Sequence, residues 1–410
     1  MSICFPVRKT TLRDTEYKRI LQELHRNYGF CPSFLYYNDL RLLSLGGFDL
    51  KAVIGTRKSE IRTNIAGVAP LATPYVLFVD PSSACNFACT FCPTGDSELI
   101  KSIGRHIGSL SFEDFEKIVA DASEFKDKFK VLRLYKDGEP LVNKRLPSMI
   151  RLARDSKLFD KIDTTTNGAL LTEVKSEELI SSGIDLINIS IDGLDAEQIL
   201  HFAKAKVDYS KFVHNIKYLN EIKGDCKIVI KTTSEIIGKN REQEFFDIFG
   251  NYCDKIFVEN TSPCWPNFDV EERMDIKITE GLYGNEIVEQ TACPYIFYSI
   301  SVNSDMKVSA CFVDWERDLI IGNLRANSLK EIWESAELNA HRLAHLSGKR
   351  KEHKTCGGCG QISHCGPDSI EGNLDEIKDK YIKTGQFANL DETMKKVGYS
   401  AVGKLLPIIN

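Results

Sequence analysis

The chain of 410 residues lacks the features that place a protein in a membrane or send it out of the cell. No stretch approaches the roughly 18 consecutive apolar residues that a membrane-spanning helix requires. The first residues, MSICFPVRKTT, contain neither a long apolar core nor a small-residue cleavage site, so no signal peptide is predicted. We therefore expect a cytoplasmic protein with no membrane partner.

Basic clusters, internal repeats and low-complexity segments are also missing. The formal net charge is -5, whereas a nucleic-acid-binding domain usually has a basic face, so no nucleic-acid partner is expected. Hydrophobic residues at 42% and charged residues at 27% are typical of a soluble globular protein. The length leaves room for one large domain and smaller additions.

Cysteine, in contrast, is abundant, with 13 residues. In a reducing compartment, clustered cysteines more often bind metal or take part in chemistry than form disulfides. Five are isolated in the sequence and are expected to be small buried side chains, namely Cys4, Cys31, Cys226, Cys253 and Cys264. The others form two groups, the first of Cys85, Cys89 and Cys92, the second of Cys293, Cys311, Cys356, Cys359 and Cys365.

From residue 75 the sequence alternates short apolar runs with amphipathic stretches, which predicts parallel βαβ units. The predicted strands are Tyr75–Asp80, Lys130–Tyr135, Lys161–Thr165, Asp185–Ile191, Lys227–Thr232 and Lys255–Glu259. The predicted helices are Phe112–Ala122, Arg145–Ser156, Glu173–Ser182, Tyr209–Ile222 and Arg241–Phe249. Six such units predict an α/β fold with a partial (β/α)6 barrel rather than a closed eight-fold barrel.

Polar or glycine-rich motifs follow these strands, where the active site of such folds lies. The first cysteine group follows the first strand, Asp137–Pro140 follows the second, and Thr166–Gly168 follows the third. Ser190 and Asp192 stand at the end of the fourth strand. The carboxyl edge of the sheet is therefore the predicted active site.

The spacing C-x3-C-x2-C of the first group places three thiolates within eight residues. Three thiolates can hold three irons of a cubane and leave the fourth iron open, whereas electron-transfer [4Fe–4S] sites usually have four cysteines. An open coordination position is what a catalytic metal needs. The alternative is a zinc knuckle that takes a ligand from elsewhere, although zinc cysteines usually come as C-x2-C pairs.

The segment from Cys85 to Cys92 resembles the C-x3-C-x-φ-C hallmark of the radical SAM superfamily, in which φ is aromatic and is here Phe91. The resemblance implies a [4Fe–4S] cluster on Cys85, Cys89 and Cys92 whose open iron chelates S-adenosylmethionine (SAM). It also implies reductive cleavage of SAM to a 5′-deoxyadenosyl radical, which abstracts a hydrogen atom from the substrate. In this family the residue at the position of Phe91 lies beside the adenine.

Three further loops gain roles from the same resemblance. Gly138-Glu139-Pro140 is similar to the GGEP stretch that holds the methionyl amine of SAM, and departs from it at Asp137. Asn167 and Ser190 match positions that contact SAM, with Ser190 near the ribose. These roles fit the chemistry, because a carboxylate pairs with an ammonium and short polar side chains bind hydroxyls.

The second cysteine group combines a predicted hairpin with a knuckle. Ile300–Val302 and Lys307–Ser309 flank a turn, and the hairpin would bring Cys293 and Cys311 together. The pair Cys356-Gly-Gly-Cys359 adds two more thiols. Four thiolates suit either zinc or an iron–sulfur cluster.

A Cys-Pro start, a hairpin that ends in Cys, the phrase Ile-Gly-Asn-Leu, a Ser-Leu-x-x-Ile-Trp helix and a C-x2-C pair together resemble the SPASM/twitch extension of radical SAM enzymes. The resemblance implies an auxiliary [4Fe–4S] cluster on Cys293, Cys311, Cys356 and Cys359, in the shorter twitch form with one cluster. Cys365 is left over as a structural residue, a substitute ligand or a hydrogen-atom donor to a substrate radical. The helix is predicted over Leu329–Leu346, with His341 and His345 on its exposed face.

The predicted domains are an N-terminal helical extension over residues 1–74, with Leu12–Tyr28 as its clearest helix, a radical SAM barrel over 75–275, a small twitch/SPASM domain over 276–370 and a helical tail over 371–410. Three reactions stay open: dehydrogenation, epimerisation with a thiol as quencher, and maturation of a ribosomally made peptide. A four-cysteine cluster without an open iron suits electron acceptance, which favours oxidation of a carbohydrate-like or aminocyclitol alcohol. The expected partners are that small molecule and an electron donor such as flavodoxin or ferredoxin. The base is not identified; candidates are Lys136, Lys231 and Arg317.

Overall fold

The computed structural model of the protein describes residues 52–55, 63–366, 369–384 and 389–401. Most of the predicted extension 1–74, including its helix Leu12–Tyr28, lies outside these residues. Contacts define one unit from Leu50 to Asn410, and the description concerns this unit.

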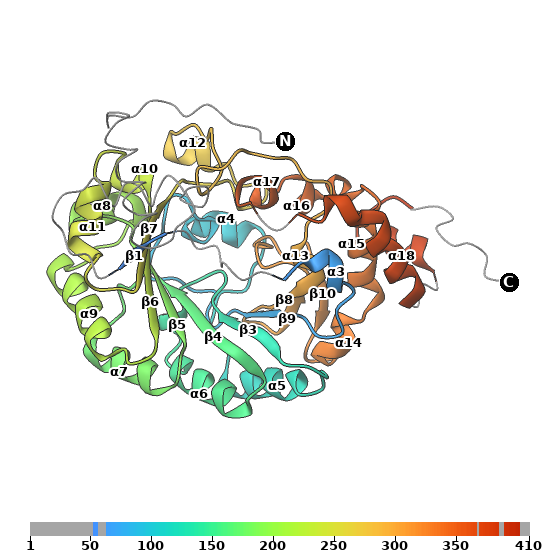
Figure 1. Cartoon of the computed structure of the whole chain (residues 1–410), viewed down its shortest axis with the longest axis horizontal. Helices are drawn as coiled ribbons and strands as arrows, with labels where there is room; N and C mark the ends of the chain where they lie inside the picture. The colour runs from blue at the N-terminus through green and yellow to red at the C-terminus, as the bar shows by residue number, and fades with distance from the viewer. Residues whose placement is uncertain (1–51, 56–62, 367–368, 385–388, 402–410) are drawn as a thin grey trace, which may run out of the picture. The chain divides into compact units, whose positions relative to one another are not determined.

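A ten-stranded sheet forms the centre of the described fold, in the order β1-β7-β6-β5-β4-β3-β2-β8-β9-β10 (Figure 1). Neighbouring strands from β2 to β7 are parallel, as predicted. Each lies within two residues of its predicted bounds: β2 (Val76–Val79), β3 (Phe129–Leu134), β4 (Phe159–Thr166), β5 (Leu186–Ser190), β6 (Lys227–Thr233) and β7 (Lys255–Glu259). The unpredicted strand β1 (Val53–Ile54) joins the edge parallel to β7.

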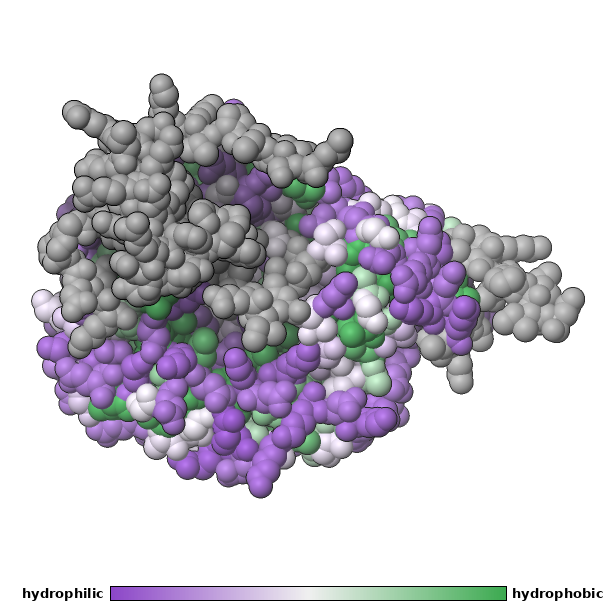
Figure 2. Space-filling view, in the orientation of Figure 1, coloured by the Kyte–Doolittle hydropathy of each residue, from purple (hydrophilic) through white to green (hydrophobic). Residues whose placement is uncertain are grey.

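Helices cover the outer face of these strands (Figure 1). They are α5 (Phe112–Ala122), α6 (Leu146–Ser156), α7 (Glu173–Ser181), α8 (Ala196–Ala203), α9 (Tyr209–Ile222), α10 (Ser234–Ile237) and α11 (Glu242–Phe249). Apolar and polar residues alternate along β5, and one set of them faces the helices. Ile187 and Ile189 of β5 are fully buried in the apolar core that also includes Ile216 of α9. The visible outer faces of α6 and α7 are mainly hydrophilic (Figure 2), because only one face of each helix packs on the sheet.

The C-terminal part continues the same sheet. Strand β8 (Ser299–Val302) pairs parallel with β2 and antiparallel with β9 (Lys307–Ser309), and β9 pairs with β10 (Ile320–Asn323). The predicted hairpin is therefore confirmed. No helix in the part of the chain that the structure describes is long and apolar enough to span a bilayer.

The helix predicted over Leu329–Leu346 is in fact two helices, α14 (Leu329–Trp333) and α15 (Ala336–Leu346). The break occurs because the Ser335 hydroxyl accepts from the Leu338 amide and starts a new helix. The expected exposure of His341 and His345 was wrong, since both are buried on α15, at 3% and 1% exposure.

Shorter elements complete the described chain. Before the C-terminal sheet strands they are α3 (Ile65–Val68), η2 (Pro93–Gly95), α4 (Ser97–Ser102), η3 (Pro140–Val142), α12 (Val270–Met274) and α13 (Tyr295–Tyr298). After them come η4 (Arg350–Glu352), α16 (Lys354–Gly357), α17 (Gln361–His364), η5 (Glu371–Asn373), α18 (Leu374–Thr384) and α19 (Leu390–Lys396).

Candidate functional site

The first cysteine group lies on the loop between β2 and α4. Cys92 begins η2, and the loop is compact, since a Cβ on Gly95 would lie only 2.2 Å from the Cys89 carbonyl oxygen. Burial raises the pKa of the Cys85 thiol to about 12, with Glu139 and Cys92 adding to the effect. The thiols of Cys85, Cys89 and Cys92 are partly buried, and those of Cys85 and Cys92 also raise the pKa of Cys89.

The loop after β3 packs directly on the cysteine loop. A Cβ on Gly138 would lie 2.3 Å from the carbonyl oxygen of Ala84, so only glycine fits there. The next amide, that of Glu139, donates to the same Ala84 oxygen at 3.0 Å. The Gly-Glu-Pro motif is thereby held against the start of the cysteine loop, and Pro140 is buried at the start of η3.

Glu139 joins the loops after β3 and β4. Its buried carboxylate accepts hydrogen bonds from the Leu141 amide at 3.0 Å, the Thr166 hydroxyl at 2.7 Å and the Asn167 amide at 2.8 Å. The Asn167 side chain in turn donates to Asn86 of the cysteine loop at 2.9 Å. One carboxylate therefore fixes two of the three loops that the sequence connected with SAM.

The remaining predicted positions also belong to this edge of the sheet. Ser190 is the half-buried last residue of β5. Phe91 packs, partly buried, against the small apolar cluster that contains Ile100 and Trp315. The structure thus places Phe91, Glu139, Asn167 and Ser190 at or after the carboxyl ends of β2, β3, β4 and β5.

Sequence reasoning did not assign Asp192 a role, although it lies beside the cysteine loop. The Cys89 thiol is 3.9 Å from its carboxylate, and burial raises the pKa of Asp192 to about 7. Across the sheet, Lys231 of β6 forms an ion pair with Glu259 of β7 at 2.6 Å. Lys231 was a candidate base, but its buried partner Glu259 comes from the next strand and could not be paired with it from sequence.

The second cysteine group lies on several elements of the C-terminal part. The hairpin, α13 and the knuckle at α16 bring four thiols together; burial raises the pKa of the Cys311 thiol well above its ordinary value, and three thiols near it add to the effect, those of Cys293, Cys356 and Cys359. Cys365 lies just outside this set at the end of α17, where its sulfur is 3.4 Å from the Ser262 hydroxyl. Cys264, predicted to be an isolated small buried residue, is half-buried and lies near Cys365.

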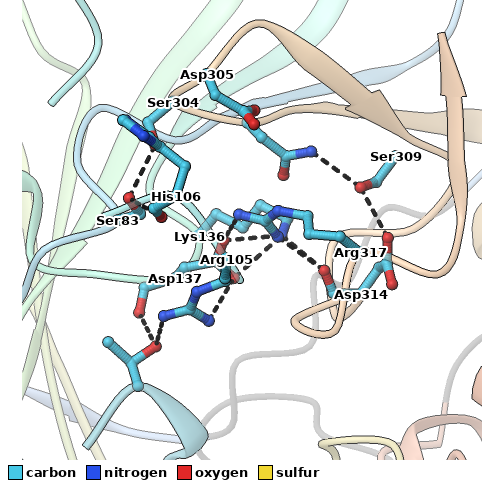
Figure 3. Close-up of polar contacts among 12 residues, drawn as sticks. Ser83, Arg105, His106, Lys136, Asp137, Ser304, Asp305, Ser309, Asp314 and Arg317 are labelled. Atoms are coloured by element: carbon cyan, nitrogen blue, oxygen red, sulfur yellow. Dashed lines mark hydrogen bonds and ion pairs between the residues drawn. The ribbon is translucent and has the colours of Figure 1, made fainter. Parts of the chain in front are cut away.

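A buried network of charges connects the loops of the two cysteine groups (Figure 3). Asp137, which replaces a glycine of the family motif, pairs with Lys136 at 3.0 Å and with Arg317 at 2.5 Å. Arg105 lies 4.0 Å from the same carboxylate and donates to the Thr94 hydroxyl at 2.8 Å. Thr94 follows Cys92 by two residues, so the network reaches the cysteine loop.

The other end of this network reaches the second cysteine group. Lys136 and Arg317 both donate to the backbone oxygen of Asp314, three residues after Cys311. Burial acts to raise the pKa of Asp137, but the surrounding cations outweigh it and hold the pKa well below its usual range. Burial and the Asp137 charge raise the pKa of Asp80 to about 7, and neither oxygen of Asp80 has a hydrogen-bond partner among the described residues.

The donor chemistry of both cysteine groups fits iron–sulfur clusters. Buried thiols with raised pKa values stay protonated until a cationic group compensates the thiolate charge, so cluster binding would release protons. Within the described ranges, no three His, Cys, Asp or Glu side chains converge on one ion position. A cubane takes one thiolate per iron and so spreads its ligands over several corners.

Comparison with known proteins gives the same two parts. Residues 79–245 match the model of the Radical SAM superfamily, and residues 293–360 match SPASM, an iron-sulfur cluster-binding domain. The chain thus contains a radical SAM domain and a C-terminal SPASM domain. Its cofactors are a SAM-binding [4Fe–4S] cluster, SAM itself and an auxiliary iron–sulfur cluster in the SPASM domain.

Individual relatives cover different shares of the chain. A GTP 3′,8-cyclase of Syntrophomonas wolfei subsp. wolfei is 34% identical over 129 residues, 31% of this chain but only 36% of the cyclase. A tungsten-containing aldehyde ferredoxin oxidoreductase cofactor-modifying protein of Pyrococcus furiosus is 27% identical over 63% of this chain and 80% of its own length. SuiB of Streptococcus suis, solved with its precursor peptide SuiA, shares the fold with a TM-score of 0.52 and 16% identity, over 89% of this chain and 87% of SuiB.

Proposed function

We propose that the cysteine loop holds the SAM-binding cluster through Cys85, Cys89 and Cys92, and that SAM lies over the loops of Phe91, Gly138, Glu139, Pro140, Asn167 and Ser190. When bound, the cluster supplies the electron that cleaves SAM. The residues of the chain do the positioning, because the hydrogen bonds of Glu139 and Asn167 keep the loops in one arrangement. We propose that the barrel that carries out this chemistry consists of residues 75–275.

The auxiliary cluster is proposed to bind the four thiols of Cys293, Cys311, Cys356 and Cys359, in a domain of residues 276–370. The electrostatic effects of these thiols on one another support one shared site. Cys359 and Cys356, for example, both act to raise the pKa of Cys293. Four protein thiolates leave no iron open for a substrate. The role that suits such a cluster is electron acceptance, with flavodoxin or ferredoxin as the proposed donor for the first cluster.

The reaction that we propose is oxidation of an alcohol on a carbohydrate-like or aminocyclitol small molecule. The observation that supports it is the Lys231–Glu259 pair at the carboxyl ends of β6 and β7. Glu259 is 2% exposed, and its Oε1 atom has no hydrogen-bond partner among the described residues. Because buried polar atoms need hydrogen-bond partners, the Lys231–Glu259 pair favours a ligand rich in hydroxyl or amino groups over an apolar one.

The names of two relatives point in the same direction. The Syntrophomonas wolfei protein is named for GTP, and the Pyrococcus furiosus protein is named for modifying a cofactor. Both ligands are small molecules. We infer the small size of the substrate from these two names. Its hydroxyl or amino groups are proposed from the Lys231–Glu259 pair alone.

Epimerisation is the second candidate, and the position of Cys365 favours it. Its thiol is half-buried, and both Lys231 and Glu259 act on it electrostatically. A thiol near Lys231 and Glu259 is placed to return a hydrogen atom to a radical of a substrate bound there. Oxidation and epimerisation therefore share one binding site and differ in whether Cys365 is needed.

The cluster assignment is tested by counting iron and sulfide per chain after anaerobic reconstitution. Wild type is expected to hold about eight irons, and variants with Cys85, Cys89 and Cys92 changed to Ala, or with Cys293, Cys311, Cys356 and Cys359 changed to Ala, about four each. A wild type with about four irons and a first-group variant with none would remove the auxiliary cluster and the oxidation with it. Cys226→Ala, a buried cysteine outside both groups, is the control and should keep the full count.

The reaction is tested with a panel of aminocyclitols and sugars under reducing conditions with SAM. A substrate should raise 5′-deoxyadenosine formation above the background rate and yield a ketone. Recovery of an isomerised alcohol with solvent deuterium on carbon, and its loss in Cys365→Ala, would replace oxidation by epimerisation. Stimulation by peptides but by no member of the panel would contradict both.

A further inference from the structure

A buried ring cluster lies beside the second cysteine group, partly outside the matched SPASM residues. Tyr399 follows α19 in the tail, His341 is on α15, and His353 precedes α16. Their ring centres are 5.4 to 5.6 Å apart, and they are 3%, 3% and 7% exposed. A tyrosine and two histidines so deeply buried need hydrogen-bond partners.

The tail is held so that Tyr399 has a defined position. Lys396 forms an ion pair with Glu337 of α15 at 2.8 Å, and the Ser400 amide donates to Glu352 at 2.7 Å. Between them, Gly398 has a φ of 88°, a value that favours glycine, and turns the chain inward. These contacts on both sides of Tyr399 fix its ring against the knuckle.

The hydroxyl of Tyr399 lies 3.1 Å from Nδ1 of His341. It is also near the Cys356 thiol, because Tyr399 acts to lower the pKa of Cys356 and Cys356 acts to raise the pKa of Tyr399. A tyrosine hydroxyl has one proton to donate, and a cysteine that binds iron is a thiolate and only accepts. Tyr399 must therefore donate to Cys356 once a cluster is bound. The Nδ1 atom of His341 must then carry the proton and donate to Tyr399.

We propose that His341 and Tyr399 form a hydrogen-bond relay that ends on the auxiliary cluster through Cys356 and raises its reduction potential. The proposal rests on the proposed assignment of Cys356 as a cluster ligand. Hydrogen bonds to ligating sulfurs and exclusion of solvent set cluster potentials, because both act on the extra negative charge of the reduced state. The relay stabilises that charge, so Tyr399 is a positioning and tuning residue that makes the cluster a better electron acceptor.

Burial supports this arrangement of protons. It lowers the pKa of His341 to about 3, so the imidazole is neutral at physiological pH and has one N–H to place. The neighbouring His345 uses its nitrogen in the opposite sense, because its Nδ1 accepts from the Cys293 amide at 3.2 Å. Two histidines one turn apart are thereby held in different tautomers, His345 beside the proposed ligand Cys293 and His341 beside Tyr399.

The test isolates the auxiliary cluster in the full-length chain with Cys85, Cys89 and Cys92 changed to Ala, and measures its midpoint potential by EPR-monitored titration. Adding Tyr399→Phe removes one hydroxyl and should lower the equilibrium constant for reduction about tenfold, or ~59 mV for one electron. His341→Gln should shift it in the same direction by less. Tyr381→Phe is the control, because this equally buried tyrosine packs on Phe297 and Arg342, and should leave the potential unchanged.

The outcomes separate this proposal from the cluster assignment. If the parent variant with Tyr399 intact holds no iron, the assignment of the four cysteines fails. If the parent holds about four irons and Tyr399→Phe titrates at the parent potential, the relay is overturned while the assignment stands. If Tyr399→Phe loses its cluster, His341→Gln decides, and an unchanged potential in that variant overturns the relay.

Discussion

Asp137 is the residue whose charge the structure makes most costly to remove. In Asp137→Asn the side chain keeps its size but loses the charge that faces three cations, those of the buried Lys136 and Arg105 and the partly buried Arg317. The side chains of Asp137, Lys136 and Arg105 have no solvent exposure. Removing one partner from a buried ion pair costs about 3–5 kcal/mol, because the remaining charge keeps its desolvation penalty.

The expected loss can be read as a melting temperature. A large domain loses about 2–4 °C per kcal/mol, so the midpoint of the cluster-loaded protein should fall by roughly 6–20 °C. Anaerobic thermal unfolding followed by circular dichroism, at one protein concentration and scan rate, measures it. The variant Asp137→Asn with Arg317→Met should recover part of the loss, because it removes one of the uncompensated cations.

A matched exposed pair gives the control. Glu289 pairs with Lys351 at 2.8 Å, but the two side chains are 69% and 65% exposed. Such surface pairs contribute about 0–1 kcal/mol, so Glu289→Gln should shift the midpoint by no more than a few degrees. If Asp137→Asn lowers the midpoint no further than Glu289→Gln does, the reasoning from burial is refuted.

Three further predictions follow from the loops and from α15. Gly138→Ala should abolish SAM binding, measured by equilibrium dialysis, because its Cβ would overlap the oxygens of Ala84 and Ser82 at 2.3 and 2.4 Å; Gly67→Ala, where a Cβ meets nothing within 4 Å, tests the same change without an overlap. Glu139→Gln should lower the unfolding free energy by about 1–3 kcal/mol, since the new amide turns a donor toward the Asn167 or Leu141 amide; an unchanged denaturation midpoint would contradict the three-bond description. Because the folded pKa of His341 is depressed, its stabilising contribution is present above about pH 6.5 and is lost at about 1.4 kcal/mol per unit as pH falls toward 3. The stability difference between wild type and His341→Gln should therefore narrow as pH falls from 7 to 5, and a constant difference would contradict the burial of a neutral imidazole.

The parts of the fold that the sequence predicted are those with strong local patterns. Runs such as the isoleucines of β5 alternate with polar residues, so their strand and its buried face could be recognised without a structure. The end of α14 could not, because Ser335 is a modest helix residue until its hydroxyl caps the next helix. His341 and His345 were misplaced because their partners, Tyr399 and the Cys293 amide, each lie more than fifty residues away along the chain.

The candidate site shows the same limit. The spacing of Cys85, Cys89 and Cys92 is local and identified the motif, whereas the partners of Asp137 and Lys231 come from other loops and strands. Lys136 and Arg317 were considered as bases for a substrate, and the structure pairs both with Asp137 instead. Ion pairs between residues far apart in the chain leave no periodic pattern in a sequence, so only the structure could reveal them.

The hydrogen-bonded ladder between β2 and β8 has a consequence for engineering. Four residues of β2 pair in parallel with four residues of β8, although β2 ends where the radical SAM match begins and β8 lies within the SPASM match. A barrel expressed alone would end with β2 as an open edge whose unpaired amides and carbonyls invite pairing with other chains. The two parts should therefore be exchanged between relatives as one piece, cut in a surface loop rather than at the boundary that the family matches indicate.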